Sequence, residues 1–217
     1  MKPLTVREDF AEITRLVAPG ARVLDVGCGE GVLLERLIRE KQADGRGIEI
    51  SPAGVSACLA RGLAVLQGDA DRDLDYFPPM AFDYAILSQT LQQVQNPRHV
   101  LGELLRIGRQ AIVSVLNFGH WRVRLDLLSR GRMPVTGALP DPWWSTRNIH
   151  LCTVRDFTAL CDDLGLVIDA CAALTSGESA RPMDPRRPIE NWRAEAALFV
   201  LSRADRSPAT PGAGVNR

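Results

Sequence analysis

The chain has 217 residues, a formal net charge of zero and a hydrophobic content of 46%. This length suits one domain with a sizeable core, and the balanced charge disfavours nucleic acid or an anionic membrane as the main partner. The N-terminus carries charged residues without an apolar segment, and no uncharged apolar run approaches the roughly 20 residues needed to span a bilayer. We therefore expect a cytoplasmic protein with no membrane partner.

The cysteines are odd in number and contain no C-x-x-C pair. They are Cys28, Cys58, Cys152, Cys161 and Cys171. This pattern argues against a disulfide framework and against a zinc ribbon. We expect free, mostly buried thiols in a reducing compartment and no bound metal.

The first elements in the chain are a helix, a short strand and a glycine-rich turn. Residues 7–18 place apolar side chains on one helical face, Pro19-Gly20 ends that helix, and residues 22–26 form a β-rich apolar run. Residues 27–31 carry glycine at alternate positions, and residues 32–41 return to helical spacing. Such glycines allow the backbone to approach a ligand closely, and the following helix presents unpaired N–H groups to it.

Strands and helices continue to alternate along the rest of the chain. Further strands are predicted at 45–50, 63–67, 82–88 and 110–116, with helices at 52–61 and from Asn96-Pro97 onward. Thr153 and Asp156 form a capping box for another helix, which Gly165 ends, and strands at 166–174 and 196–201 follow. This alternation predicts an α/β fold with a single doubly wound, mostly parallel sheet.

Polar residues and glycines follow the first four predicted strands. They are found at 25–27, at Glu49, at Asp69 and at 88–90. Because ligands of such sheets bind beyond the carboxyl ends of the strands, these residues are expected to share one rim. Together they predict a site for a nucleotide-type cofactor.

Four acids alternate after the third strand and raise the question of calcium. They are Asp69, Asp71, Asp73 and Asp75. An EF-hand loop that starts at Asp69 would need glycine at position 74 and glutamate at position 80, where the chain has Leu74 and Met80. The calcium interpretation is rejected.

The spacing Asp25-x-Gly27-x-Gly29-x-Gly31 distinguishes between nucleotide cofactors. A dinucleotide site needs G-x-G-x-x-G, and a carboxylate before the first glycine would repel a pyrophosphate. The same carboxylate suits a ligand with an ammonium and a sulfonium group, such as S-adenosylmethionine. These residues resemble the class I S-adenosylmethionine-dependent methyltransferase family.

That resemblance implies roles for individual residues. Asp25 and the backbone of Gly27 and Gly29 would hold the methionine moiety, Glu49 the ribose hydroxyls, and 68–70 the adenine edge. The full cofactor set expected from it is Asp25, Gly27, Cys28, Gly29, Gly31, Glu49, Ile50, Gly68, Asp69, Ala70, Ser88 and Gln89. It also implies S-adenosylmethionine or S-adenosylhomocysteine as cofactor, no metal, and an antiparallel last strand at the sheet edge.

A narrower resemblance, to the methionine biosynthesis MetW family, rests on longer segments. These are SQTLQ (88–92), RQAIVS (109–114), NFGHWRVRL (117–125), GRMPVT (131–136) and NIHLCT (148–153). With the glycine loop, the similarity covers about residues 13–170. It implies a protein of methionine synthesis that acts with, and supports, a homoserine O-acyltransferase of the MetX type. The alternative is an active methyltransferase on a small-molecule acceptor.

The block at 117–152 holds three of the four tryptophans, namely Trp121, Trp143 and Trp144. Between residues 98 and 132 there are also seven arginines but only two acids. Aromatic and arginine side chains are favoured at partner interfaces, and a long loop beside a site can act as a lid. A third possibility is that the tryptophans fill a core beneath this loop.

Catalysis is left open by the sequence. Many small-molecule methyltransferases of this broad family read L-x-H-V-x-x-P after the fourth strand, whereas this chain reads LQQVQNP at 91–97. Gln93, in place of the histidine, cannot titrate, and the remaining histidines are His99, His120 and His150. His120 and His150 are the weak candidates for a base.

We expect residues 1–206 to form one methyltransferase-like domain, with a cofactor half at 7–117, an insertion or lid at 117–152 and a helix and strand pair at 153–202. The Arg- and Pro-rich segment 175–193 is expected to be an extended surface loop, and it departs from the family pattern, as does the tail. Residues 207–217 are predicted to be a disordered tail.

Overall fold

A computed structural model describes residues 8–204 except 137, 138 and 140. Its elements, in chain order, are α1 (Glu8–Leu16), β1 (Arg22–Val26), α2 (Val32–Lys41), β2 (Asp44–Glu49), α3 (Pro52–Ala60), β3 (Val65–Gln67), the 3-10 helix η1 (Leu74–Tyr76), β4 (Phe82–Ser88), α4 (Pro97–Ile107), β5 (Gly108–Leu116), α5 (Trp121–Arg130), α6 (Val154–Asp163), β6 (Leu166–Leu174), β7 (Arg181–Pro182), α7 (Pro188–Arg193) and β8 (Ala196–Arg203). Residues 207–217, predicted to be a disordered tail, lie outside this description.

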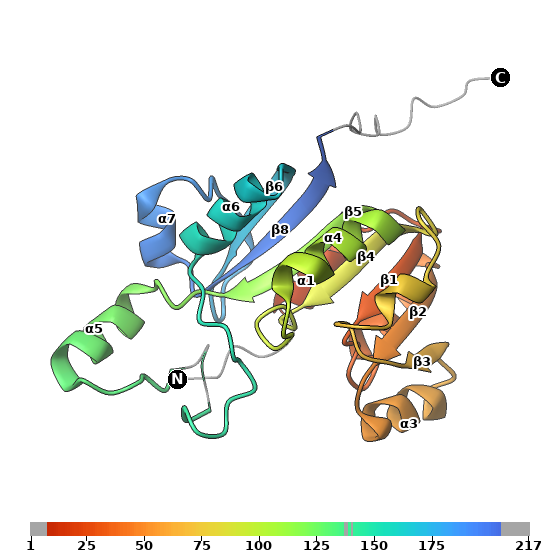
Figure 1. Cartoon of the computed structure of the whole chain (residues 1–217), viewed down its shortest axis with the longest axis horizontal. Helices are drawn as coiled ribbons and strands as arrows, with labels where there is room; N and C mark the ends of the chain where they lie inside the picture. The colour runs from red at the N-terminus through yellow and green to blue at the C-terminus, as the bar shows by residue number, and fades with distance from the viewer. Residues whose placement is uncertain (1–7, 137–138, 140, 205–217) are drawn as a thin grey trace.

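One eight-stranded sheet carries the fold, in the order β3-β2-β1-β4-β5-β8-β6-β7 (Figure 1). The strands from β3 to β5 are parallel, and β8 runs antiparallel between β5 and β6. The chain leaves β1 toward one edge and returns at β4 on its other side, so strand order switches between β1 and β4. The predicted doubly wound sheet with an antiparallel last strand is confirmed, and the switch marks the expected place for a ligand.

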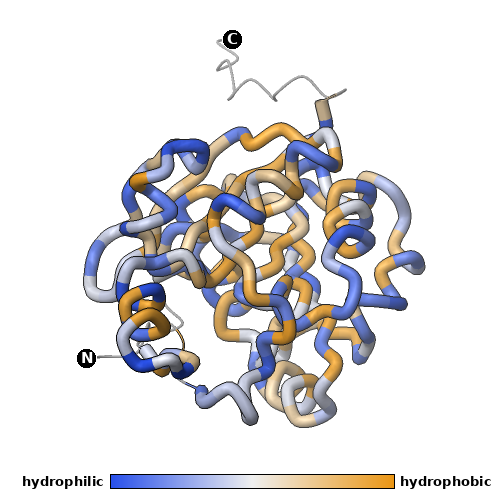
Figure 2. The backbone as a smooth tube through the Cα atoms, turned by 60° about the vertical axis from the view of Figure 1, so that its left-hand side comes forward, coloured by the Kyte–Doolittle hydropathy of each residue, from blue (hydrophilic) through white to orange (hydrophobic). Residues whose placement is uncertain are grey.

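Two hydrophobic layers cover the two faces of the sheet. Leu24 and Val26 of β1 pack with α4 and α6, whereas Val23, which points the other way, packs with α1 and α2. In Figure 2 the hydrophobic segments run mostly through the centre of the molecule. Because side chains of a strand alternate between faces, a short run such as β1 supplies both layers.

The C-terminal strands extend the same sheet. β8 pairs with β5 from Leu116↔Ala196 to Ala111↔Leu201, and every residue of β8 before Arg203 is buried. Phe199 of β8 contacts Phe157 of α6, with ring centroids 4.6 Å apart. The predicted capping box of α6 is present, since Thr153 Oγ1 accepts from the Asp156 N–H.

The segment 175–193 is more ordered than the predicted extended loop. It contains β7, which pairs with β6, and the short helix α7. Pro188 occupies the first turn of α7, where a missing N–H costs nothing, so a proline that indicated a loop in fact begins a helix. Arg181 forms a bidentate ion pair with the buried Glu190 of α7 and holds the two pieces together.

The block 117–152 begins at a buried polar anchor. Asn117 donates through Nδ2 to the carbonyls of Asn191 and Ala194, and its Oδ1 accepts the N–H of Gly119 and Val154. This one side chain therefore ties the start of the block to α6 and α7. The block itself contains α5, a helix that the sequence pattern did not predict.

The tryptophans of this block do not form a core. Trp143 and Trp144 are 68% and 72% exposed, and Trp121 is also exposed. The interpretation in which they fill a core beneath the loop is therefore wrong. In the part of the chain that the structure describes, no helix is both long enough and apolar enough to cross a membrane.

Candidate functional site

A buried carboxylate lies at the carboxyl end of β1, beside the switch in strand order. Asp25 is only 2% exposed, and the charges that act on it come from Asp9 and Glu49, both of them acids. Burial, and then the negative charges of Asp9 and Glu49, raise the pKa of Asp25 to about 7. The negative charges of Asp9 and Glu49 thus oppose the ionisation of Asp25.

Asp9 joins this site from α1. The hydroxyls of Ser88 and Ser114, paired in register at the ends of β4 and β5, both donate to its Oδ2, at 2.5 and 3.0 Å. Its other oxygen, Oδ1, is buried and has no hydrogen-bond partner among the residues that the structure describes. Burial raises the pKa of Asp9 despite the two hydroxyls. A buried acceptor left without a donor is costly, and a donor from a ligand would satisfy it.

Glu49, at the end of β2, is held by the backbone on both sides. Its Oε2 accepts the N–H of Gly29 and its Oε1 accepts the N–H of Ser51, each at 2.8 Å. The glycine loop and the start of α3 are therefore joined through this carboxylate. Each oxygen keeps a further lone pair, so Glu49 can still accept from a pair of ligand hydroxyls.

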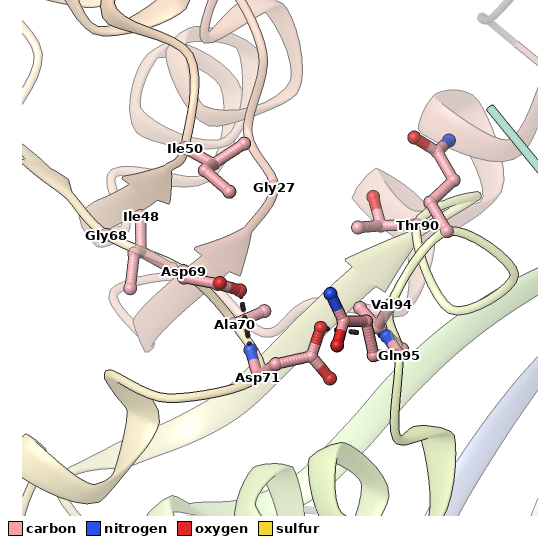
Figure 3. Close-up of a pocket in the computed structure, with 11 residues that line it drawn as sticks. Gly27, Ile48, Ile50, Gly68, Asp69, Ala70, Asp71, Thr90, Val94 and Gln95 are labelled. Carbon is pink, nitrogen blue, oxygen red and sulfur yellow. Dashed lines mark hydrogen bonds between the residues drawn. The ribbon is translucent and has the colours of Figure 1, made fainter.

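A cavity of about 210 Å³ opens beyond the ends of these strands (Figure 3). Its lining comes from the glycine loop, from the ends of β2 and β3 and from the loop after β4. The residues are Gly27, Ile48, Ile50, Gly68, Asp69, Ala70, Asp71, Thr90, Gln93, Val94 and Gln95. Apolar walls beside backbone groups suit a flat ring with polar edges.

Five predicted cofactor residues line this cavity, namely Gly27, Ile50, Gly68, Asp69 and Ala70. Asp25, Gly29 and Glu49 lie at the acidic end described above. Ser88 donates to Asp9, and Gln89 has a left-handed backbone (φ 51°) and donates its N–H to Ser114 Oγ. Ser88 and Gln89 are outside the cavity lining, and their contact with a ligand stays a prediction.

Cys28 and Gly31 support the loop from behind. The Cys28 sulfur is 3.8 Å from that of Cys58, and burial raises the pKa of both thiols. Gly31 caps α2 with φ 78°, and a Cβ there would lie 2.4 Å from Leu63. In this structure these two residues pack the loop against α3.

The alternating acids after β3 close the cavity. Asp71 accepts the N–H of Gln95 and of Asn96 at 2.8 and 2.9 Å, and so joins the two loops on either side of the cavity (Figure 3). Asp69 accepts from the Asp71 N–H, and Asp73 accepts from the Asp69 N–H. The run that suggested calcium is a set of backbone caps. Among the residues that the structure describes, no group of three or more His, Cys, Asp or Glu could hold a metal ion.

Neither histidine candidate lies in the cavity. His120 is the N-cap of α5, where its Nδ1 accepts the Arg122 N–H at 3.4 Å, and burial lowers its pKa. The backbone of His150 is bonded to Gln92, and its buried ring Nε2 has no partner within the described part of the chain. A role for either in catalysis stays a prediction.

Asp9 is the main site residue that the sequence analysis missed. It lies four residues before Ile13, on the apolar face of α1. An acid on a face that is otherwise apolar could have indicated a buried functional carboxylate. Val94 was also missed as a lining residue, although it lies in the loop that follows β4, whereas Thr90 belongs to the predicted rim at 88–90.

Gly27 provides a test of how tightly this site is built. Its φ is +71°, and a Cβ there would lie 2.8 Å from both Oγ1 and Cγ2 of Thr90, whose hydroxyl is fixed on the Ser88 carbonyl. Gly20 has the same φ with open space around it. We expect Gly20→Ala to lower the free energy of unfolding by about 1 kcal/mol, from backbone strain alone. We expect Gly27→Ala to lower it by roughly 2 to 4 kcal/mol, because overpacking is added. Equal values in urea denaturation would show that Thr90 moves freely.

The site has the chemistry for a ligand with a cationic end and a flat, hydroxyl-bearing end. Among the residues described, Asp9 and Asp25 offer carboxylates on which no cation is seen to act, and Oδ1 of Asp9 is buried without a donor. Glu49 offers lone pairs beside the cavity, and the cavity accepts a ring.

Comparison with known proteins places this geometry in a family. The family model described as "Methionine biosynthesis protein MetW" matches residues 7–201. The chain is 31% identical over 212 residues to the bifunctional methionine biosynthesis protein MetXA/MetW of Rhodopirellula baltica, covering 94% of this chain and 34% of that protein. It is 34% identical over 120 residues to the ubiquinone biosynthesis O-methyltransferase of Xylella fastidiosa, covering 52% of this chain and 48% of that enzyme.

Among solved structures, the chain is similar to a SAM-dependent methyltransferase of Thermotoga maritima, described as a possible histamine N-methyltransferase. The TM-score is 0.67 at 16% identity, over 92% of this chain and 89% of the other. At this identity the likeness shows the fold alone, which is the class I methyltransferase fold. Since the family model matches nearly the whole chain, this protein belongs to the MetW family of methionine biosynthesis proteins.

Proposed function

We propose that this protein binds S-adenosylmethionine or S-adenosylhomocysteine, and that it acts with, and supports, a homoserine O-acyltransferase of the MetX type. The observation that carries the partnership is the relative in which MetXA and MetW are one polypeptide. This chain spans about a third of that relative, 34% of its length. The acyltransferase would then correspond to the MetXA part of that relative.

The acidic end of the site supports the choice of ligand. Asp25 and Asp9 would attract the ammonium and sulfonium groups, and the orphan Oδ1 of Asp9 would gain a donor. Glu49 would accept the ribose hydroxyls with the lone pairs that the Gly29 and Ser51 N–H groups leave. The adenine ring would enter the cavity between Ile50 and Val94.

Regulation follows from the chemistry of the pathway. S-adenosylmethionine is made from methionine, so a protein that binds it beside an early enzyme of methionine synthesis could report the supply of product. For such feedback the ligand must bind with different affinity to the free and the partner-bound protein.

Methyl transfer to a small acceptor is the second candidate. The similarity to an O-methyltransferase over about half of the chain favours it. Against it stands the composition of the cavity, because the described lining has aspartates and glutamines but no histidine, and Gln93 stands where many such enzymes carry one. Proximity alone can still carry part of a methyl transfer.

The test uses the purified chain and the homoserine O-acyltransferase of the same organism. We expect the two to co-purify and the acyltransferase rate to change when the chain is added in equal amount. We expect S-adenosylmethionine to bind the chain in calorimetry, and to shift its affinity for the acyltransferase by about fivefold or more.

The controls separate the two halves of the proposal. If S-adenosylmethionine binds but the acyltransferase neither associates nor changes its rate, the partnership is wrong. Release of S-adenosylhomocysteine with an acceptor from a metabolite screen would support the methyltransferase instead. If neither nucleotide binds, the ligand assignment is wrong.

A further inference from the structure

Helix α5 leaves most of its apolar side chains in solvent. Val123 is its one buried residue among those described, while Leu125, Leu127 and Leu128 are 53%, 49% and 85% exposed. The helix projects from one end of the molecule, away from the sheet (Figure 1). A ten-residue helix is marginal in water on its own, so a helix of this kind needs packing on a second surface.

The first turn of α5 is nevertheless firmly attached. Arg124 donates to the Gly119 carbonyl at 2.6 Å and lies over the Trp192 ring, and Arg122 lies 3.9 Å from Glu195. The helix is thus held at its N-terminal end with its leucines left uncovered. A fixed orientation is what a docking element requires.

The chain after α5 forms a second apolar feature, a cavity of about 290 Å³. Its lining is Phe118, Met133, Pro134, Leu139, Asp141, Trp143, Thr146, Asn148, Ile149 and Leu151. Of these, Met133, Trp143, Ile149 and Leu151 are exposed. The described lining of this cavity shares no residue with that of the cofactor cavity.

We propose that α5 and the described residues that line this second cavity together form the surface on which the homoserine O-acyltransferase docks. This proposal rests on the proposed function and adds which surface of the protein binds the acyltransferase. Large exposed apolar patches on a monomer mark interaction sites, and a pocket lined by tryptophan and methionine accepts an anchoring side chain.

The occupant is argued from the fused relative. The region similar to this chain and the MetXA region there share one polypeptide, so they are tethered to each other in every molecule. An obligate neighbour can cover apolar surface permanently. Arg132 and Arg147 are exposed and are neighbours in sequence of lining residues, and one acid, Asp141, is in the lining, so we expect a partner surface that is apolar at its centre with acids opposite the two arginines.

The test compares three variants of the full chain in binding the purified acyltransferase. The double change Leu125→Glu with Leu128→Glu alters α5, and Trp143→Ser alters the cavity wall. Leu59→Glu on α3 is the matched control, because Leu59 is 59% exposed and lies outside both cavities. We expect each of the first two to weaken binding about tenfold or more, and the control to bind like the wild type.

The outcomes separate the docking surface from the proposed function. No binding by the wild type contradicts the proposed function itself. Binding by the wild type with equal affinity in all variants overturns the docking surface alone. A tenfold loss of S-adenosylmethionine affinity in the α5 or Trp143 variant, with intact binding of the acyltransferase, also overturns the docking surface. That result would identify α5 and the second cavity as a lid over the ligand site. Light scattering tests for a dimer. If the wild type is a dimer, the α5 variant is a monomer and acyltransferase binding is unchanged, the face binds a second copy of this chain. Circular dichroism checks that each variant is folded.

Discussion

Asp25→Asn should make the protein more stable at pH 8 and at the same time impair the binding of S-adenosylmethionine. Burial and the charges of Asp9 and Glu49 raise the pKa of Asp25 to about 7, so its ionised form is unfavourable in the unliganded protein. Asparagine removes that charge with little change in shape. We expect the free energy of unfolding at pH 8 to rise by roughly 2 to 4 kcal/mol, and S-adenosylmethionine affinity to fall by about tenfold or more.

The stability difference between the wild type and Asp25→Asn should depend on pH. The pKa of Asp25 is higher in the folded than in the unfolded chain. Its protonation therefore contributes stability that is fully present below about pH 3.8 and is lost as the pH rises through about 7. Wild type and Asp25→Asn should thus unfold at similar urea concentrations at pH 4 and diverge toward pH 8.

Ligand affinity should follow the opposite course. A cationic ligand favours ionised Asp25, so S-adenosylmethionine should bind more tightly as the pH rises from 5.5 to 7.5, by up to about tenfold per pH unit. Adenosine lacks both cationic groups and is the control ligand, with a nearly flat profile expected. A flat S-adenosylmethionine profile in calorimetry would mean that Asp25 does not face the cationic end.

Gln92→Leu should have the second large effect, because this side chain joins the cofactor loop to the proposed docking face. Gln92 is 1% exposed. Its Oε1 accepts the Leu116 N–H at 2.8 Å, and its Nε2 donates to the carbonyls of Leu116 and His150. Its own carbonyl accepts from the N–H groups of Ile149 and His150.

Leucine at this position would leave three backbone groups, two of them in buried hydrogen bonds, without the partner that the Gln92 side chain provides. We expect a loss of roughly 2 to 4 kcal/mol in the free energy of unfolding, which corresponds to about 5 to 15 °C in Tm for a chain of this size. Gln110→Leu is the control, since Gln110 makes one exposed hydrogen bond, to Asp169. Its Tm should change by less than about 2 °C.

The same variant tests the docking surface at a temperature where it is still folded. Ile149 and Leu151 line the second cavity, and the Gln92 side chain holds the carbonyl of His150, which lies between them in sequence. The two hydrogen bonds from the Ile149 and His150 N–H groups go to the Gln92 backbone carbonyl and remain in the variant. We expect acyltransferase affinity to fall about tenfold with the variant and to stay unchanged with the control. Wild-type affinity in folded Gln92→Leu would show that the Gln92 side chain does not hold the docking face in its binding conformation.

The fold was predictable because its signals are local. Apolar runs, alternating glycines and capping residues mark β1, the loop and α2 within a few positions of one another. The rim site then follows from parallel topology, which brings Asp25, Glu49 and Asp69 to one edge. These steps need no long-range information beyond the order of the strands.

The sequence analysis missed one residue whose partners are distant in sequence and one helix whose apolar side chains are mostly unpacked. Asp9 meets Ser88 and Ser114, which are 79 and 105 residues away in sequence. Helix α5 was missed for a different reason. Its apolar residues alternate at 121, 123, 125 and 127, a spacing typical of strands, and they need not form a helical stripe because only Val123 packs inward.

The uncovered leucines of α5 also bear on how much of this protein a cell can hold. If the acyltransferase docks on α5 as proposed, copies made in excess of it would expose Leu125 and Leu128 and would self-associate or be degraded, so abundance should track that of the acyltransferase. Joining both on one gene, as in the Rhodopirellula baltica relative, fixes the ratio of the two at one to one. Where the genes are separate, we expect selection to keep their dosage matched.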